Sequence, residues 1–355
     1  MNKWLNPRSA LGIALITAAL VALPFVAAMG GQAWVRILDF AILYVFLALG
    51  LNIVVGYAGL LDLGYIAFYA VGAYLYALLA SPHFGLHWPF WAILPLGAVV
   101  ACVFGVLLGT PTLKLRGDYL AIVTLGFGEI IRIFMNNLNA PINITNGAQG
   151  ITLIDPVAFG GFRFSGNSEL FGFTISGPQK YYFLLVALAL LVIVINLRLQ
   201  QSRIGRAWQA IREDEIAAKA VGINTRNVKL LAFAMGASFG GIAGGIFSAM
   251  QGFVSPESFS LIESIMILAM VVLGGMGHIP GVILGAVLLS VLPEALRYGV
   301  GPIQTALFGK MLVDPESLRM LVFGLALVLV MRFKPAGLWP APERKRELSE
   351  KGGAA

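Results

Sequence analysis

Long apolar segments separated by short polar connections limit the possible folds of this chain more than any other sequence feature. A transmembrane helix needs about 20 predominantly apolar residues, within a range of about 17–25. We predict about ten transmembrane helices in an all-α, polytopic membrane protein. The predicted spans are Leu11–Ala28, Ile37–Val55, Tyr65–Ala80, Phe90–Gly109, Tyr119–Leu138, Tyr181–Leu197, Leu230–Gln251, Leu261–Leu273, Gly281–Leu296 and Leu318–Val330.

Composition supports a bilayer as the surrounding solvent. Hydrophobic residues make up 59% of the chain and charged residues only 12%, whereas a soluble protein carries about 25% charged residues. A soluble core cannot absorb this much apolar surface. The apolar run Leu11–Ala28 is longer than the roughly 7–15 residues of a signal-peptide core. We therefore expect a retained first helix rather than a cleaved signal peptide.

Lysine and arginine indicate the orientation. With ten spans and a cytoplasmic N-terminus, 17 of the 24 basic residues fall on the cytoplasmic side, as the positive-inside rule requires. Both termini are then cytoplasmic, with residues 1–338 forming one transmembrane domain and residues 339–355 a disordered cytoplasmic tail. The stretch 139–179 falls outside and is rich in Gly, Asn, Ser and Thr. This predicts a loop with short strands or hairpins, of a length that is usually functional.

One internal segment, residues 198–229, concentrates charge between apolar runs. It holds seven of the 24 basic and three of the 17 acidic residues. Arg206–Val221 lacks Gly and Pro, which predicts a short helix or helix pair that ends at Gly222. Glu215 and Lys219 form a favourable i,i+4 pair. The predicted apolar face has small side chains: Ala207, Ala210, Ile211, Ala217, Ala218 and Val221. Such a face suits a groove on a partner protein better than a lipid surface.

Two glycine-interrupted stretches, Gly56–Gly64 and Gly274–Gly281, lie between hydrophobic segments. They fit two interpretations equally. Unwound backbone within a membrane occurs where it lines a cavity, but the same pattern also makes tight turns between neighbouring helices. Our candidates for a translocation pathway are Asn52, Gly56, Gly59, Asp62, Gly64, Glu129, Arg132, Gly274, Gly275 and Gly277.

Few ionisable residues lie within the predicted spans. Glu129 and Arg132 are i,i+3 neighbours, and an internal ion pair facing a neighbouring helix is favoured over a role on a substrate path. Asp39 and Glu263 lie close to the ends of spans, where we expect their carboxylates to reach water.

The sequence contains no pattern that indicates catalysis. The phosphate-binding motif G-x-x-x-x-G-K-[ST] is absent. The three histidines, His83, His87 and His278, do not have the spacing of a metal-ligand cluster. We expect no catalytic residue, no metal site and no cofactor in this chain.

The segment EIAAKAVGI at residues 215–223 resembles the E-A-A-x-x-x-G loop of permease subunits of ABC importers, with Ile216 inserted before the alanine pair. Further segments are similar to the branched-chain amino acid permease family, specifically its larger M-type subunit. They are LRGDYLAIVTLGFGEIIRI (115–133), NGAQGI (146–151), VSPESF (254–259), GGMGHIPGVILGA (274–286) and RFKPAGL (332–338).

The resemblance implies a transporter subunit of a bacterial inner membrane that moves Leu, Ile or Val by alternating access. It implies a homologous second permease subunit, two ATPase subunits that bind ATP and Mg, and a periplasmic binding protein. The residues that it implies in ATPase coupling are Arg206, Arg212, Glu213, Asp214, Glu215, Ala217, Ala218, Gly222 and Ile223. Relatives that carry urea, short-chain amides or other amino acids share these segments. An ATP-independent carrier or channel would leave the charged segment without a purpose, and a membrane scaffold without transport is a third alternative.

Overall fold

The computed structural model describes residues 7–112, 115, 117–159, 162–170, 173–308, 321, 324–325, 328–330, 332–334 and 336–340. Eleven α-helices lie within these ranges: α1 (Pro7–Met29), α2 (Gln32–Asn52), α3 (Ile66–Leu79), α4 (Phe90–Thr112), α5 (Asp118–Asn137), α6 (Gly177–Gln200), α7 (Arg203–Glu213), α8 (Glu215–Ala220), α9 (Thr225–Gln251), α10 (Leu261–Gly274) and α11 (Ile279–Phe308). A π-helical turn, η1 (Ile53–Tyr57), continues α2, and two 3-10 turns are η2 (Gly147–Gln149) and η3 (Pro256–Phe259).

Nine of the ten predicted spans coincide with helices α1–α6 and α9–α11. The tenth, Leu318–Val330, lies mostly outside the described residues, as does the predicted tail. By length and composition, five helical segments in the described part of the chain could cross a membrane: 32–57, 90–112, 177–200, 225–251 and 279–296. Helices α3 and α10 are apolar but shorter. The chain is therefore a mostly helical, polytopic membrane protein.

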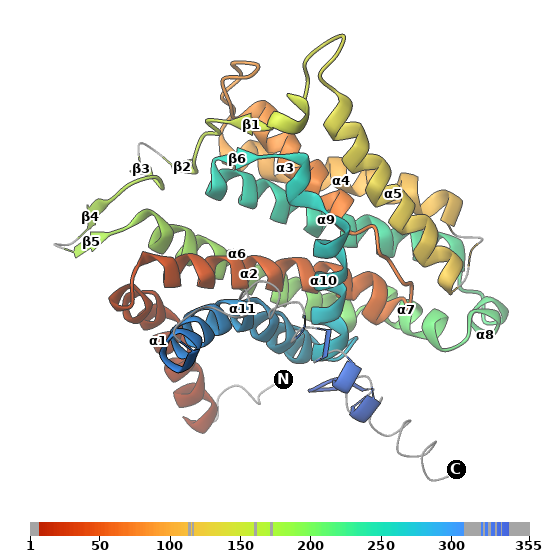
Figure 1. Cartoon of the computed structure of the whole chain (residues 1–355). Helices are drawn as coiled ribbons and strands as arrows, with labels where there is room; N and C mark the ends of the chain where they lie inside the picture. The colour runs from red at the N-terminus through yellow and green to blue at the C-terminus, as the bar shows by residue number, and fades with distance from the viewer. Residues whose placement is uncertain are drawn as a thin grey trace.

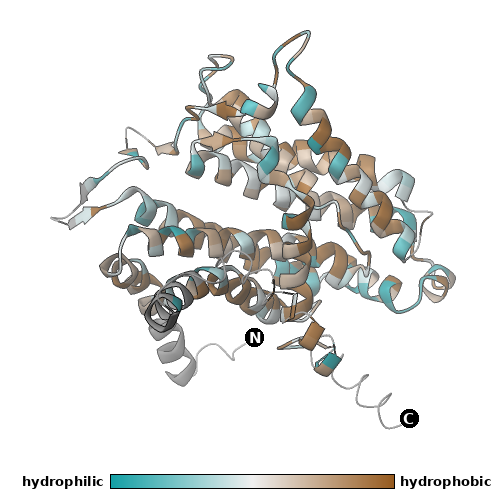
Figure 2. Ribbon diagram, viewed as in Figure 1, coloured by the Kyte–Doolittle hydropathy of each residue, from teal (hydrophilic) through white to brown (hydrophobic). Residues whose placement is uncertain are grey.

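The helices form two groups that meet along α9. In Figure 1, α3, α4, α5 and α9 lie above, and α1, α2, α6 and α11 lie below. Helix α9 packs against α3 and α4 and also against α2, while α10 packs against α2 and α11. Apolar residues follow the helices, and polar residues gather at two opposite ends of the molecule (Figure 2). We call these the strand end, which carries β2–β5, and the loop end, which carries α7 and α8 (Figure 1).

Small residues let α9 approach its neighbours closely. A Cβ at Gly72 of α3 would lie 2.1 Å from the carbonyl oxygen of Gly241, and one at Gly244 would lie 2.1 Å from the carbonyl oxygen of Tyr69. Without a hydrophobic effect between helices in lipid, such backbone proximity is a main source of helix association. The small-residue spacing in α9 therefore positions the helix that connects the loop end with the strand end.

The stretch 139–179 contains short antiparallel pairs, as predicted. Strand β2 (Ala158–Phe159) pairs with β3 (Phe162–Arg163), and β4 (Ser168–Leu170) pairs with β5 (Phe173–Ile175). Strand β1 (Ile151–Thr152) pairs with β6 (Phe253–Val254), which follows α9. The strand end is thereby attached to the helix that crosses to the loop end.

The buried Lys180 in the first turn of α6 fixes the hairpins to the helices. Its Nζ donates to the carbonyl oxygens of Arg163 and Gly166 and to Ser168 Oγ, at 3.2, 2.9 and 2.6 Å. The same ammonium lies 4.9 Å from the centre of the Phe162 ring, a cation–π distance. These contacts attach the predicted hairpins to the first turn of α6.

Candidate functional site

Helix α7 is anchored to the base of α9 by a buried tryptophan. Trp208 has no exposed surface, and its Nε1 donates to the carbonyl oxygen of Val228 at 2.7 Å. Ser202 caps the helix by accepting from the Gly205 backbone nitrogen at 3.1 Å, which satisfies a free N–H of the first turn. Sequence reasoning missed Trp208, although a tryptophan within a polar segment is the signal that could have identified this anchor.

The charged segment folds as a helix pair, because Asp214 interrupts it. Asp214 has an extended backbone, and its Oδ1 accepts from the backbone nitrogens of Ile216 and Ala217 at 2.7 and 3.1 Å. It therefore ends α7 and starts α8. The helix pair was predicted, but its small apolar side chains do not share one side: Ala218 is buried, whereas Ala217 and Val221 are exposed.

Gly222 ends α8, as predicted. Its φ is +89°, a left-handed conformation that favours glycine. Its backbone nitrogen donates to Lys219 O, and the nitrogen of Ile223 donates to Ala218 O, both at 3.0 Å. These two bonds are the Schellman pattern of a helix C-terminus. The geometry of the turn into α9 therefore depends on this glycine.

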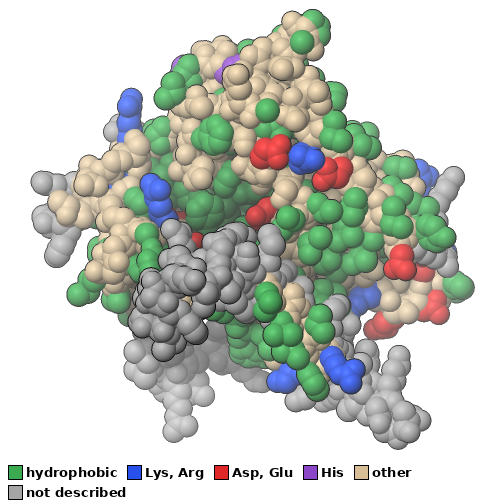
Figure 3. Space-filling view, in the orientation of Figure 1, with side chains coloured by type: hydrophobic (Ala, Val, Ile, Leu, Met, Phe, Trp, Pro, Cys, Tyr) green, Lys and Arg blue, Asp and Glu red, His purple; other side chains and the backbone are tan. Residues whose placement is uncertain are grey.

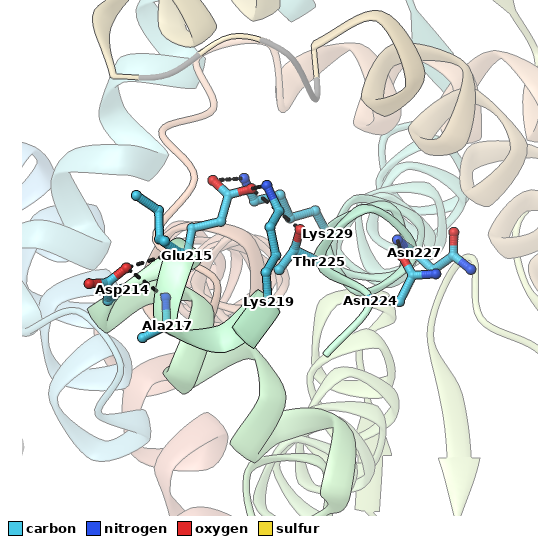
Figure 4. Close-up of polar contacts among 9 residues, drawn as sticks. Asp214, Glu215, Ala217, Lys219, Asn224, Thr225, Asn227 and Lys229 are labelled. Carbon is cyan, nitrogen blue, oxygen red and sulfur yellow. Dashed lines mark hydrogen bonds and ion pairs between the residues drawn. The ribbon is translucent and has the colours of Figure 1, made fainter. Parts of the chain in front are cut away.

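Glu215 joins α8 to α9 (Figure 4). Its Oε2 accepts from Lys229 Nζ at 2.8 Å, its Oε1 forms the predicted ion pair with Lys219 at 3.1 Å, and the Thr225 hydroxyl donates to it at 3.4 Å. Burial alone would raise the pKa of Glu215, but the hydrogen bonds and charges of Lys229 and Lys219 outweigh it and lower the pKa to about 2. Glu215 is therefore a carboxylate over the physiological pH range, and it faces its own chain.

The exposed surface of α8 and its C-cap carries two large aliphatic side chains beside the exposed Lys219. Ile216 is 69% exposed and Val221 is 77% exposed. Of the predicted coupling residues, Arg206, Arg212, Glu213, Asp214, Ala217 and Gly222 are also exposed, whereas Ala218 is buried and Glu215 and Ile223 are intermediate. These exposed aliphatic residues can contact a partner protein while the bonds from Glu215 to Lys219 and Lys229 stay intact.

Arg212 connects this loop to the first glycine-interrupted stretch. Its Nη1 donates to the carbonyl oxygen of Gly56 at the end of α2. A Cβ at Gly59 would lie 2.8 Å from Arg212 Cγ, and one at Gly277 would lie 3.2 Å from Arg212 Nη1. The arginine side chain thus occupies the space that glycines leave in both interrupted stretches.

The two glycine-interrupted stretches meet in what we call the glycine junction, which comprises residues 52–59 and 274–277. Asn52 Oδ1 accepts from the Gly277 backbone nitrogen at 2.8 Å in a buried position. A Cβ at Gly56 would lie 2.7 Å from that nitrogen. The second stretch forms a tight connection between the packed helices α10 and α11, and Trp339 donates its backbone nitrogen to Gly274 O at 3.1 Å.

The chain between the glycine junction and α3 is held by two further helices. Asp62 is fully buried, and its Oδ1 accepts from the Gly64 backbone nitrogen at 2.8 Å. Leu63 donates its backbone nitrogen to Thr124 Oγ1 of α5 at 3.0 Å and accepts from Ser264 Oγ of α10 at 2.6 Å. These contacts bring Asp62 and Gly64 near α5 and α10. That these residues line a translocation pathway stays a prediction.

Glu129 and Arg132 form the predicted i,i+3 ion pair at 3.0 Å, and Arg132 also lies 3.6 Å from Glu257 of η3. They contact η3 rather than the glycine junction.

For Asp39, the expected exposure to water was wrong. Its side chain is 1% exposed, and it lies where the beginning of α2 faces the end of α9 and part of the stretch 139–179.

The family model for the permease component of branched-chain amino acid transport systems matches residues 33–331. The chain belongs to this family. It is 45% identical to the high-affinity branched-chain amino acid transport system permease protein LivM of Escherichia coli K12, over 97% of this chain and 77% of that protein.

More distant members align as well. The probable branched-chain amino acid transport permease protein LivM of Methanocaldococcus jannaschii is 28% identical over 88% of this chain and 96% of its own length. The permease protein LivH of Salmonella typhimurium is 28% identical over 84% of this chain and 92% of its own length. No solved structure matches this chain.

Proposed function

We propose that this chain is one of two transmembrane subunits of an ABC importer for leucine, isoleucine and valine. In this proposal a homologous second permease subunit completes the pore as a heterodimer. Two ATPase subunits bind ATP and Mg and dock at the loop end, while a periplasmic binding protein delivers the amino acid at the strand end. Ten spans place both termini in the cytoplasm of a bacterial inner membrane. The similarity to LivM and LivH, two permease proteins of such systems, supports a paired arrangement.

The observation that carries this proposal is the bond from Arg212 to Gly56. Helix α8 offers exposed Ile216 and Val221 to a partner, and α7 carries Arg212 into the glycine junction. A displacement of α7 and α8 by nucleotide-driven closure of the ATPases would reach the ends of α2 and α10 directly. Nucleotide can drive such a change only by binding one state better than the other, which is the requirement for alternating access.

Co-purification and reconstitution test this proposal. Purification of the chain in mild detergent should bring ATPase subunits with it, and the reconstituted complex should take up labelled leucine only with ATP and the binding protein. Unlabelled Leu, Ile and Val should compete, while urea and short-chain amides should not. Competition by urea or amides would change the substrate. Uptake without any ATPase would favour a secondary carrier, and an absence of all transport would favour a scaffold.

Two variants test the coupling role of α8. Glu215→Lys places a third cation beside Lys219 and Lys229, and Gly222→Val forces a branched residue into a left-handed conformation, which costs about 1–2 kcal/mol. Both should lower leucine uptake per ATP hydrolysed at equal membrane abundance. Asp118→Lys is the matched charge reversal, because Asp118 is exposed in the first turn of α5. Normal uptake by the α8 variants would refute the coupling role.

A further inference from the structure

A cavity of about 400 Å³ opens at the strand end, between the beginning of α2, the end of α9 and the beginning of α6. Figure 3 shows a hollow in this region, lined by hydrophobic side chains and bordered by charged ones. Its volume falls within the roughly 300–1,000 Å³ of small-molecule pockets. Part of its wall comes from five residues of the long predicted loop: Ile154, Pro156, Phe164, Ser165 and Gly166.

Two opposite charges line the cavity from one face of α2. Arg36 and Asp39 are i,i+3 neighbours, and both contribute to its wall. Asp39 is 1% exposed, and its Oδ1 has no hydrogen-bond partner among the described residues. A buried carboxylate without a partner is costly. Within the membrane, such a group indicates a functional site.

The two helix ends in the wall have opposite polarity. Gly177 and Pro178 at the beginning of α6 line the cavity, as do Met250 and Gln251 at the end of α9. A helix N-terminus carries partial positive charge, and a C-terminus carries partial negative charge. Arg36 and α6 therefore provide an anion-binding side, and Asp39 and α9 provide a cation-binding side.

The remaining wall is apolar and firmly held. Phe40, Ile154, Phe164 and Met250 supply hydrophobic surface. The Tyr181 hydroxyl donates to Ala249 O at 2.8 Å and accepts from the Val157 backbone nitrogen at 3.1 Å, so one side chain joins α6, α9 and the loop. A site that is dipolar on one part and aliphatic on the other matches an amino acid with an apolar side chain.

We propose that this cavity binds a free aliphatic α-amino acid as a zwitterion, with the ammonium group at Asp39 and the carboxylate at Arg36. Under the proposed function, on which this inference rests, the strand end faces the binding protein. The cavity would then be the first low-affinity site that substrate occupies after its release into the membrane subunits.

Ligand-observed NMR on the complete complex tests the site directly. The probes, added to complex in phosphatidylcholine nanodiscs without binding protein, are L-leucine, 4-methylpentanoate and 3-methylbutylamine. The second lacks the ammonium group and the third lacks the carboxylate. Because hydrogen bonds to charged groups are the strong ones, leucine should give a saturation-transfer signal about tenfold stronger than either analogue. Equal signals from the three probes would overturn the proposal.

Charge-neutralising variants assign the signal to the cavity. Asp39→Asn and Arg36→Gln should each reduce the leucine signal and the initial uptake rate about tenfold. Asp155→Asn and Arg163→Gln make the same charge changes near the cavity without lining it, and should retain both. Arg36 is exposed, so Arg36→Gln tests the site even where Asp39→Asn fails to fold.

The outcomes separate this inference from the proposed function. If the wild-type complex imports leucine and both cavity variants match it in signal and uptake, the inference is wrong and the function stands. If the wild-type complex binds leucine at Asp39 and Arg36 but imports none, the proposed function fails and the site stands. A leucine signal that disappears when phosphatidylethanolamine replaces phosphatidylcholine would assign the cavity to a lipid headgroup with a primary ammonium and overturn the inference.

Discussion

The two ends of α2 differ in how much space surrounds their buried polar groups. At the loop end, Asn52 pairs with Gly277 and the carbonyl oxygen of Gly56 pairs with Arg212, in a junction with no space for a further Cβ. At the strand end, Asp39 has an oxygen without a partner and lines a cavity of about 400 Å³. Asn52 Nδ2 at the loop end also has no hydrogen-bond partner among the described residues, so the two ends differ in free volume. A buried polar atom beside open space is a place for a ligand, whereas one in a packed junction is not.

This difference fits the division of labour in a transporter subunit. Under the proposed function, the loop end transmits displacement, and tight packing can transmit it because packed cores have low compressibility. Under the same proposal, the strand end receives a solute, which needs free volume and unpaired charge. The same helix can serve both purposes because it is rigid between them.

A methyl group at the glycine junction should have the largest effect on stability. In Gly56→Ala the new Cβ would lie 2.0 Å from Asn52 Oδ1 and 2.7 Å from the Gly277 nitrogen, so Asn52 must give up its hydrogen bond. We expect a loss of about 3 kcal/mol, measured as a lower thermal midpoint of the purified complex.

Two controls make that measurement a test of the comparison. Gly126→Ala adds the same methyl group where no atom lies within 4 Å, and Ser165→Val adds bulk to the wall of the strand-end cavity. Both should melt like the wild type. If Ser165→Val lowers the midpoint as much as Gly56→Ala does, the two ends of α2 do not differ in packing.

Removal of the arginine link should impair transport more than assembly. Arg212→Ala removes the hydrogen bond to Gly56 O, and hydrogen bonds to charged groups contribute about 1.5–3 kcal/mol. We expect leucine uptake to fall about tenfold while ATPase subunits still co-purify. Arg226→Ala is the matched control, because Arg226 is exposed in the first turn of α9 and is not among the predicted coupling residues. A loss of co-purification in Arg212→Ala would make Arg212 a docking residue instead.

The exposed residues of α8 should affect docking alone. Ile216→Ser removes an aliphatic side chain that is 69% exposed, so folding should be unchanged, while affinity for the ATPase should fall by about 1 kcal/mol, or roughly fivefold. Titration of purified ATPase subunits onto the permease pair measures this. Ile142→Ser is an equally exposed control at the strand end, at 68%. Equal affinity in the two variants would exclude Ile216 from the interface.

The helices were predictable because a span leaves a run of about 20 apolar residues in the sequence. The Glu215–Lys219 pair was predictable because a helix brings i and i+4 together. The bonds from Glu215 to Lys229 and from Arg212 to Gly56 were not, since no periodicity relates residues across a turn or 156 positions apart. The burial of Asp39 was also missed, because its position near the end of a span does not reveal which loop folds over it.

The smallest effect should come from titrating the link between α8 and α9. The folded-state pKa of Glu215, about 2, lies below its ordinary value of 4.5. A lowered carboxyl pKa adds stability that is fully present above the ordinary value and is lost as pH falls towards the folded value. The thermal midpoint of wild type should therefore exceed that of Glu215→Gln by a constant amount, about 1 °C, from pH 5 to 8. This difference should shrink between pH 4.5 and 2. A difference that changes between pH 6 and 8 would mean that another group controls the link, and the internal pairing of the loop end would then be incomplete.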